Sequence, residues 1–577
     1  MRLTRRGWIG ASAALTGLSF ATGSGAAPSA SASAPGRPVG DFQILSPGAG
    51  HDYGPALAAL RDYALAELVA WGLPGMTLSV TDLDGFTAVL ALGWADVDRR
   101  NPVSPGHYFQ IGSISKSFIA LTLLALADEG RVDIDSPVAR YLPDAALPPE
   151  PISLAQLISH TGGLPADAPI FPRGGDGRLW CGFTPGSHFS YSNTGYTLLG
   201  RVIERVTGLP HQAAVTKYVR AKLGLADVRG TISQARRSEL AVGYWPWDRT
   251  VAASLPGARL EFASWDEEDT PAGSICATSE QMAVYLRAMM RIGRGEASPV
   301  LSNASARRFV TPVIPAPQFG HDGHYACGVA VAKLDDAPAL HHTGGMMSFS
   351  SSFHADPTAG VGCFASVNAR NDEYRPRQTT AFAIRLLRAI RVGAPLPTPP
   401  DPLAPLYLKD ASPFLGRFVG DHGEMVIDEG YGGATISLSG SVGRFFPGGP
   451  DRLVTDHPVL ARYGLDAVRE SGKVVGYWWG DTYYGRDTLR APPPASEALR
   501  PYAGIYLNRD PWIGGGELLV RGGALVVEGL GRIVDHGGWW ASDKDSGGLE
   551  RIRFDALLNG RMQRATISGD DLLRITI

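Results

Sequence analysis

The pattern of apolar and polar positions gives the first part of the chain a mixed character. Residues 55–71 carry apolar side chains at helical spacing and predict an amphipathic helix. Residues 76–94 are typical of two strands joined by a tight turn at Asp84-Gly85. Residues 117–128 are apolar on nearly every side, as in a helix buried in a core. Together these elements predict an α/β (α+β) domain.

The C-terminal part has a different texture, with short β-branched or alternating runs interrupted by glycine. These runs cover residues 425–428, 434–439, 474–479, 518–521, 524–528 and 564–568. Such spacing predicts all-β structure. The stretches Phe414-Leu-Gly-Arg-Phe-Val-Gly420 and Tyr502-Ala-Gly-Ile-Tyr-Leu-Asn508 resemble each other and lie 88 positions apart. The faint repeat indicates two copies of one small β-barrel.

Two proline clusters mark the boundaries between these regions. Residues 395–405 contain six prolines and predict an extended, semi-rigid linker. Pro492-Pro493-Pro494 separates the two β regions. We therefore predict a large domain at 33–394, a linker at 395–405, and β-barrel domains at 406–491 and 496–577.

The first 32 residues predict an export signal. A twin-arginine pattern at Thr4–Ile9 precedes a short apolar stretch, and Ala30-Ser31-Ala32 provides a small-residue cleavage site. The alternative, an apolar core helix, fits less well because the segment continues into a Gly/Ala/Ser/Pro tract that packs poorly. No later run reaches the ~18 apolar residues of a membrane span. We expect a secreted or periplasmic protein with no membrane span in its mature form.

Composition and charge narrow the range of partners. The chain has 53 basic and 56 acidic residues, a formal net charge of −3, and 44% hydrophobic residues. This near-neutral balance gives no bulk attraction to nucleic acid or anionic membranes. We expect a small-molecule or peptide substrate and no nucleic acid, and the sequence leaves a homo-oligomer open.

The cysteine count is even, and the expected destination is oxidising. The four cysteines are Cys181, Cys276, Cys327 and Cys363. They allow three complete disulfide pairings, among which the sequence cannot choose. Buried free thiols are an equally good interpretation.

The first candidate for catalysis is Ser113-Ile-Ser-Lys116, which follows Gly112 and precedes the apolar helix. Free N–H groups and the helix dipole favour negative charge at this position. Three residues make nearly one turn, so Ser113 and Lys116 share a face. A buried lysine there can have a lowered pKa and activate the hydroxyl. Alone, the pair also fits an ordinary Ser N-cap followed by a solvated lysine.

Two further motifs add groups suited to proton transfer and substrate binding. Tyr191-Ser-Asn193 lies on a polar turn before a helical run. A phenol near a cationic lysine ionises more easily and can act as a general base. His342-Thr343-Gly344, followed by Gly345, has the texture of an edge strand whose glycines let a ligand approach the backbone. Taken alone, the third stretch fits better to a surface turn with two histidines.

In this order, the three motifs resemble those of the serine β-lactamase and penicillin-binding protein superfamily, in its esterase and D-aminopeptidase branch. The resemblance extends from about residue 55 to 392 through further signature-like stretches at 93–98, 109–118, 157–164, 191–196 and 271–279. It implies a central antiparallel sheet flanked by helices and a helical lobe that holds the tyrosine motif. The two tail segments would be lipocalin-like barrels. No metal and no cofactor are expected.

The resemblance also implies roles for the individual residues. Ser113 would be the acylated nucleophile, and Tyr191, aided by Lys116, the base that activates it and then protonates the leaving group. Asn193 would orient Lys116 and the substrate amide. The backbone N–H groups of Ser113 and Gly345 would form the oxyanion hole.

The third motif departs from the lysine usual in this superfamily. His342 would line the substrate slot together with Thr343 and Gly344. An imidazole binds a substrate carboxylate less firmly than an ammonium does, which argues against an efficient β-lactamase. His341 should point to the opposite face of its strand and serve a structural role.

The expected architecture, a catalytic domain followed by two similar barrels, resembles that of D-aminopeptidases. In that group a tail-barrel loop reaches over the site and selects substrates with a free amine, and residues 508–517 are the loop to inspect here. Our leading hypothesis is a secreted serine hydrolase that cleaves D-amino-acid amides or peptides, or small esters, through a Ser113 acyl-enzyme. The alternatives are a D,D-carboxypeptidase or weak β-lactamase, and a non-catalytic penicillin-recognising or cell-wall-binding protein. The intact Ser113, Lys116 and Tyr191 argue against the last.

Overall fold

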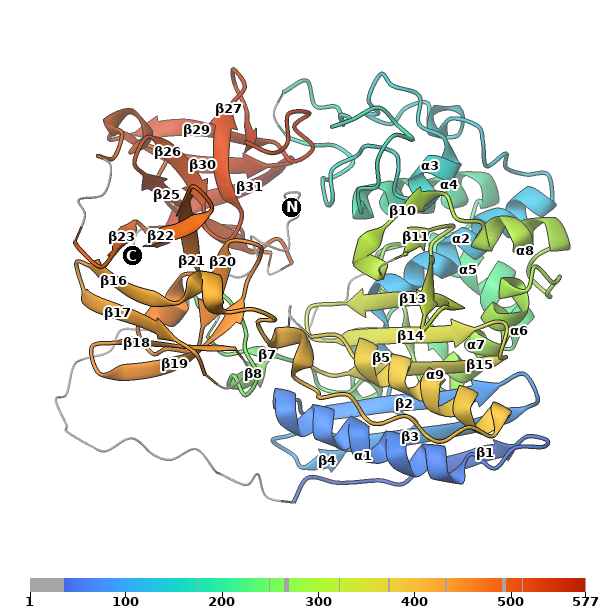
Figure 1. Cartoon of the computed structure of the whole chain (residues 1–577). Coiled ribbons are helices and arrows are strands. Elements are labelled where there is room, and N and C mark those ends of the chain that lie inside the picture. Colours follow the sequence, from blue (N-terminus) through green and yellow to red (C-terminus); the bar gives the residue numbers. More distant parts are fainter. Residues whose placement is uncertain are drawn as a thin grey trace.

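The computed structural model describes residues 36–575 except for short gaps. The gaps are 174, 249, 264–268, 321, 372–373, 431–432, 490–493 and 511. The predicted export signal at 1–32 lies outside the described residues. In the part that is described, a large α/β domain is followed by two closed β-barrels (Figure 1). The predicted fold class is confirmed.

The large domain is built on an antiparallel sheet, which has ten strands within the described ranges. Its order is β1-β3-β2-β15-β14-β13-β12-β11-β10, with β4 paired to β3. The strands are β1 Gln43–Pro47, β2 Gly75–Asp82, β3 Phe86–Asp96, β4 Asn101–Pro102, β10 Ile314–Pro315, β11 His324–Tyr325, β12 Ala330–Leu334, β13 Ala337–Gly345, β14 Ser350–Asp356 and β15 Val361–Val367. Strand β2 pairs with β15, so the start and the end of the domain meet in the middle of the sheet.

Helices cover both faces of this sheet, as Figure 1 shows. Helices α1 (Gly54–Trp71) and α9 (Arg377–Val392) pack on one face, in a core that includes Cys363 and Ala365 of β15. Helix α7 (Ser279–Gly293) packs on the other face, in a core that includes Phe364. Successive side chains of a strand point to opposite faces, so β15 contributes to both cores.

A helical lobe lies beside the second face. It contains α2 Ser115–Asp128, α3 Leu154–Ile158, α4 Asn193–Thr207, α5 His211–Val215, α6 Ala221–Leu223 and α8 Asn303–Val310. The elements predicted at 55–71, 76–94 and 117–128 are present as α1, the β2–β3 hairpin and α2. Helix α2 begins two residues earlier than predicted, because the short 3-10 turn Gly112–Ile114 leads directly into it.

The two barrels each contain eight antiparallel strands in the described residues. The first comprises β16 Gly416–Gly420, β17 Gly423–Asp428, β18 Ala434–Leu438, β19 Ser441–Pro447, β20 Arg452–Thr455, β21 Leu465–Glu470, β22 Lys473–Trp479 and β23 Thr482–Arg486. The second comprises β24 Gly504–Leu507, β25 Gly515–Arg521, β26 Ala524–Val527, β27 Gly531–Asp535, β28 Trp540–Ser542, β29 Ile552–Leu558, β30 Arg561–Ile567 and β31 Asp570–Ile575.

The internal repeat seen in the sequence reappears in the barrel closures. Phe418 of β16 pairs with Arg486 of β23, and the Arg486 guanidinium lies 4.8 Å from the Phe418 ring centre. In the second barrel, Tyr506 of β24 pairs with Arg574 of β31 at 5.9 Å. Both pairs of positions keep the 88-residue spacing of the two matching stretches. Each barrel is thus closed by the same aromatic–arginine contact between its first and last strands.

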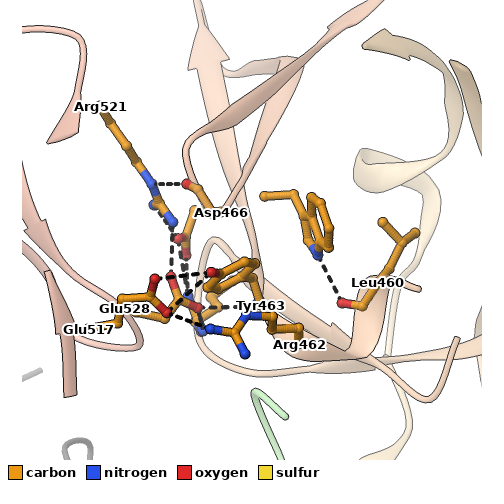
Figure 2. A network of polar contacts seen from close by, with 11 residues as sticks. Leu460, Arg462, Tyr463, Asp466, Glu517, Arg521 and Glu528 are labelled. Carbon is orange, nitrogen blue, oxygen red and sulfur yellow. Dashed lines mark hydrogen bonds and ion pairs between the residues drawn. The ribbon is translucent and has the colours of Figure 1, made fainter. Parts of the chain in front are cut away.

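A network of charged side chains joins the two barrels (Figure 2). Arg521 of the second barrel forms ion pairs with Asp466 of the first at 2.6 Å and with Glu528 at 3.0 Å. Arg452 of the first barrel pairs with the same two carboxylates. The Arg521 side chain is only 6% exposed, so these pairs are screened little by solvent. The barrels are therefore held together by buried charge pairs.

Two further expectations from the sequence bear on the fold. All four cysteines are unbonded thiols, and Cys276, Cys327 and Cys363 are buried. Of the two interpretations left open, the structure has free thiols. A search of the described helices finds none that is long and apolar enough to cross a bilayer.

The inter-barrel network predicts an asymmetric response to charge removal. R521A leaves the Asp466 and Glu528 carboxylates partly uncompensated and should cost about 3 kcal/mol of unfolding free energy. Arg500 pairs with Glu497 at an exposed site, so R500A should cost at most about 0.5 kcal/mol. Scanning calorimetry of the full chain compares the two. Equal, small effects would contradict a stabilising role for the network.

Candidate active site

Ser113 lies where the helical lobe meets the sheet. It sits in the 3-10 turn Gly112–Ile114, immediately before α2. Gly112 has a φ of 55°, and a Cβ there would collide with the backbone of Gly344 and Gly345 at the end of β13. This close approach requires glycine. It brings the chain at Gly112 against the Gly345 backbone nitrogen, and the oxyanion hole of Ser113 and Gly345 stays a prediction.

Lys116 is completely buried one helical turn after Ser113. Its Nζ donates hydrogen bonds to Ser113 Oγ at 3.2 Å and to the carbonyl oxygen of Ala272 at 2.7 Å. The same Nζ lies 4.8 Å from the centre of the Tyr191 ring and 5.3 Å from that of Tyr196. The predicted trio of Ser113, Lys116 and Tyr191 is therefore brought together in space.

The His160 ring packs against the Tyr191 ring, and the sequence analysis did not assign this contact. The two ring centres are 4.1 Å apart, and His160 Nδ1 accepts a hydrogen bond from the Ser192 N–H at 3.0 Å. Burial, reinforced by the Lys116 charge, holds the pKa of His160 well below its usual value. The neutral ring fixes Tyr191 without adding a second positive charge beside Lys116. Its signal in the sequence was its place in the 157–164 stretch.

Asn193 opens helix α4 and binds a carboxylate that the sequence analysis missed. Its Nδ2 donates to Asp167 Oδ1 at 2.7 Å. Asp167 follows the 157–164 stretch by three residues, but nothing in its local sequence pairs it with Asn193. The structure thereby adds an acidic group to the predicted substrate-binding residues.

The third motif lies on β13, next to Ser113, and its histidine is held by neighbouring groups. His342 is 1% exposed. Its Nδ1 donates to the Thr343 carbonyl at 2.6 Å, so Nε2 accepts from the Tyr325 hydroxyl at 2.9 Å. His342 thus ties β13 to β11, and its role in lining a substrate slot stays a prediction. His341 makes different contacts: it stacks on His354 at 4.1 Å.

A pocket of about 170 Å³ opens beside these groups. Of the predicted residues, Ser113, Asn193 and Gly345 line it, whereas His342, Thr343 and Gly344 are not part of its lining. Its charged groups are Asp167, Arg370 and Arg375. Trp512 of the second barrel also lines it, and this residue belongs to the 508–517 loop selected from the sequence. The pocket therefore combines both signs of charge with an aromatic wall supplied by another domain.

An antiparallel sheet, a helical lobe and a Ser–Lys–Tyr cluster at their junction define the serine β-lactamase and penicillin-binding protein class. The Beta-lactamase family model matches residues 62–386, more than half of the chain. The chain belongs to this family.

Known relatives agree with this assignment. Protein flp of Staphylococcus aureus (strain MW2) is 25% identical over 321 residues, which cover 53% of this chain and 61% of that protein. Penicillin-binding protein 4 of Amycolatopsis lactamdurans is 27% identical over 310 residues, covering 50% and 79%. The octameric penicillin-binding protein homologue from Pyrococcus abyssi shares the fold, with 20% identity, a TM-score of 0.54 and coverage of 74% and 99%. The chain thus spans about three fifths of the length of flp.

The buried neutral histidine predicts a specific pH effect on stability. The folded protein keeps the pKa of His160 low, whereas the unfolded chain takes up a proton below about pH 6.5. The group's contribution to stability is therefore lost as the pH falls below 6.5. H160N retains an acceptor and suits the φ of 59° at this position. Its free energy of unfolding should fall less steeply with acidification, by about 1.4 kcal/mol per pH unit.

Denaturant unfolding between pH 7 and pH 5 measures this difference. H188N, at an exposed histidine of the same lobe, is the matched control. Parallel pH profiles for H160N and the wild type would contradict a neutral His160.

Proposed function

We propose that the protein is a secreted serine hydrolase that forms an acyl-enzyme on Ser113 and cleaves D-amino-acid amides or peptides, or small esters. The observation that carries this proposal is the contact of Ser113 Oγ with the buried Lys116 Nζ, beside Tyr191 and at the edge of a pocket. The export part of the proposal rests on the twin-arginine pattern at the N-terminus.

The proposed reaction uses these groups in turn. Tyr191, assisted by Lys116, takes the proton of Ser113 Oγ while the oxygen attacks the scissile carbonyl carbon. The N–H groups of Ser113 and Gly345 stabilise the oxyanion that forms. The proton passes to the leaving amine or alcohol as its bond to the carbonyl carbon breaks. Water then attacks the ester on Ser113 by the same steps and releases the acid.

The acidic group of the pocket supports a substrate with a free amine. Asp167 lies on the Asn193 side, where the acyl portion of a substrate bound to Ser113 would extend. A carboxylate attracts an ammonium group, and the interaction is stronger in a partly desolvated pocket. A D-aminoacyl group places such an ammonium one carbon from the scissile carbonyl.

A second candidate function is supported by the two arginines of the pocket. Arg370 and Arg375 line it together with Gly345. Guanidinium groups bind carboxylates well, and the leaving group of a D,D-carboxypeptidase substrate carries one. A substrate panel distinguishes the two functions.

Replacing the nucleophile tests the mechanism. S113A should lower kcat at least about 10³-fold on every substrate that the wild type cleaves. The panel contains D-alanine anilide, a short acyl ester, a chromogenic cephalosporin and a D-Ala-D-Ala peptide, and S187A, at an exposed serine of the lobe, is the control. Turnover that survives in S113A would exclude the acyl-enzyme, and preference for the D-Ala-D-Ala peptide would favour the second candidate.

Neutralising Asp167 tests the substrate class. D167N keeps an oxygen that can accept from Asn193 but removes the negative charge. The ratio of kcat/KM for D-alanine anilide to that for its N-acetyl derivative should fall about tenfold, which is about 1.4 kcal/mol. An unchanged ratio in steady-state assays would show that Asp167 does not bind the amine.

A further inference from the structure

We infer that Glu550 of the second barrel is a positioning residue for the active site. It holds the peptide of Ala166 and so fixes Asp167, which makes the barrel part of the wall that binds the substrate amine. The identity of that amine rests on the proposed function. Glu550 lies 384 positions after Ala166 in the chain.

The loop between β28 and β29 reaches across to the helical lobe. Trp180 Nε1 of the lobe donates to the carbonyl oxygens of Gly548 and Leu549, at 2.9 and 3.1 Å. Gly182 lies so close to Leu549 that it has no room for a side chain. The Arg551 guanidinium lies 4.8 Å from the ring centre of Trp180. The loop is therefore closely packed against the lobe at the point where Glu550 projects.

Glu550 uses its carboxylate to connect the two domains. It is only 3% exposed. Its Oε1 accepts from the Ala166 N–H at 2.6 Å, and its Oε2 accepts from the Ser568 hydroxyl at 2.5 Å. Burying a carboxylate is costly unless such bonds satisfy it. One oxygen is thus anchored in the barrel while the other binds the backbone of the lobe.

The other side of the same peptide segment is bound by helix α4. The Ala166 carbonyl accepts from the Asn193 N–H at 2.6 Å. The Thr194 hydroxyl donates to the Ala168 carbonyl at 2.8 Å. Residues 166–168 are therefore clamped between the N-terminus of α4 and Glu550. Asp167 lies in the middle of this clamp, with its carboxylate bound to Asn193 and lining the pocket.

Two roles of Glu550 can be distinguished: positioning Asp167 in the pocket, or only holding the second barrel against the lobe. Arg173 of the lobe and Asp571 of the barrel also form an ion pair, at 2.9 Å, but Arg173 is 77% exposed and lies outside the pocket lining. If Glu550 only docked the domains, removing it would affect all ligands alike. If it positions Asp167, removing it weakens the recognition of an amine and spares ligands that lack one.

The experiment uses the full chain with E550A, E550D and E550Q, and with R173Q as the matched docking control. Calorimetry measures the affinity of two boronic acids that add reversibly to a nucleophilic serine, (1-aminoethyl)boronic acid and ethylboronic acid. Hydrogen exchange of the peptide that contains Ala166 provides a readout independent of Ser113. D167N serves as the reference for complete loss of amine recognition.

We expect E550A to lower the ratio of the two affinities about tenfold and to accelerate exchange at Ala166. E550D, whose side chain is one carbon shorter, should do both to a smaller extent. E550Q should keep the ratio of the two affinities within about threefold of wild type, because its amide oxygen can still accept the hydrogen bond from the Ala166 N–H. R173Q should match the wild type. If E550A does not fold, the comparison of E550D with E550Q carries the test.

The inference is overturned if D167N lowers the ratio but E550A and E550D do not, or if R173Q lowers it equally. Unchanged exchange at Ala166 in E550A and E550D also overturns it. If D167N itself leaves the ratio unchanged, the proposed amine substrate fails instead. The exchange measurement then still decides whether Glu550 holds the segment.

Discussion

The buried ammonium of Lys116 is the constraint on which the rest of the site depends. A charged group without water around it must be satisfied by fixed partners, here the Ser113 hydroxyl and the Ala272 carbonyl. The aromatic rings of Tyr191 and Tyr196 also lie close to this Nζ, with ring centres 4.8 and 5.3 Å away. His160 stays neutral because its burial lowers the pKa of the imidazole, and the nearby Lys116 lowers it further. One charge thus determines the chemistry of several neighbours.

The barrels extend this organisation beyond the catalytic domain. Glu517 of the second barrel binds two residues of the first barrel. Its carboxylate accepts a hydrogen bond from the Tyr463 hydroxyl at 3.1 Å and forms an ion pair with Arg462 at 3.2 Å (Figure 2). Glu517 lies on β25, which directly follows the loop that carries Trp512. The loop enters the pocket from a strand that is anchored to another barrel. The first barrel thereby helps to hold the strand that follows the loop through which the second barrel lines the pocket.

Much of this structure could be predicted from local sequence, and the limits have a physical cause. Helical spacing and glycine-interrupted runs depend only on residues that are close in sequence. The sequence pattern could therefore locate α1, α2 and the barrel strands. Ser113 lies in the short turn that leads into α2, and Lys116 lies in the first turn of that helix, so their contact follows from helical spacing. Ala166 with Glu550 and Tyr325 with His342 meet only through tertiary packing, which leaves no periodic signal. Trp512 could be anticipated only as part of a loop.

The histidine that replaces the usual lysine changes the charge pattern of the site. A lysine on β13 would present a cation close to Ser113, whereas His342 directs its two nitrogens to Thr343 and Tyr325. The positive charge of the pocket comes instead from Arg370 and Arg375, and Asp167 supplies the negative charge. Opposite charges on different parts of one pocket orient a dipolar ligand more strongly than either charge alone. The pocket thus offers groups of both signs to a ligand, and this is the charge pattern that the substrates we propose would meet.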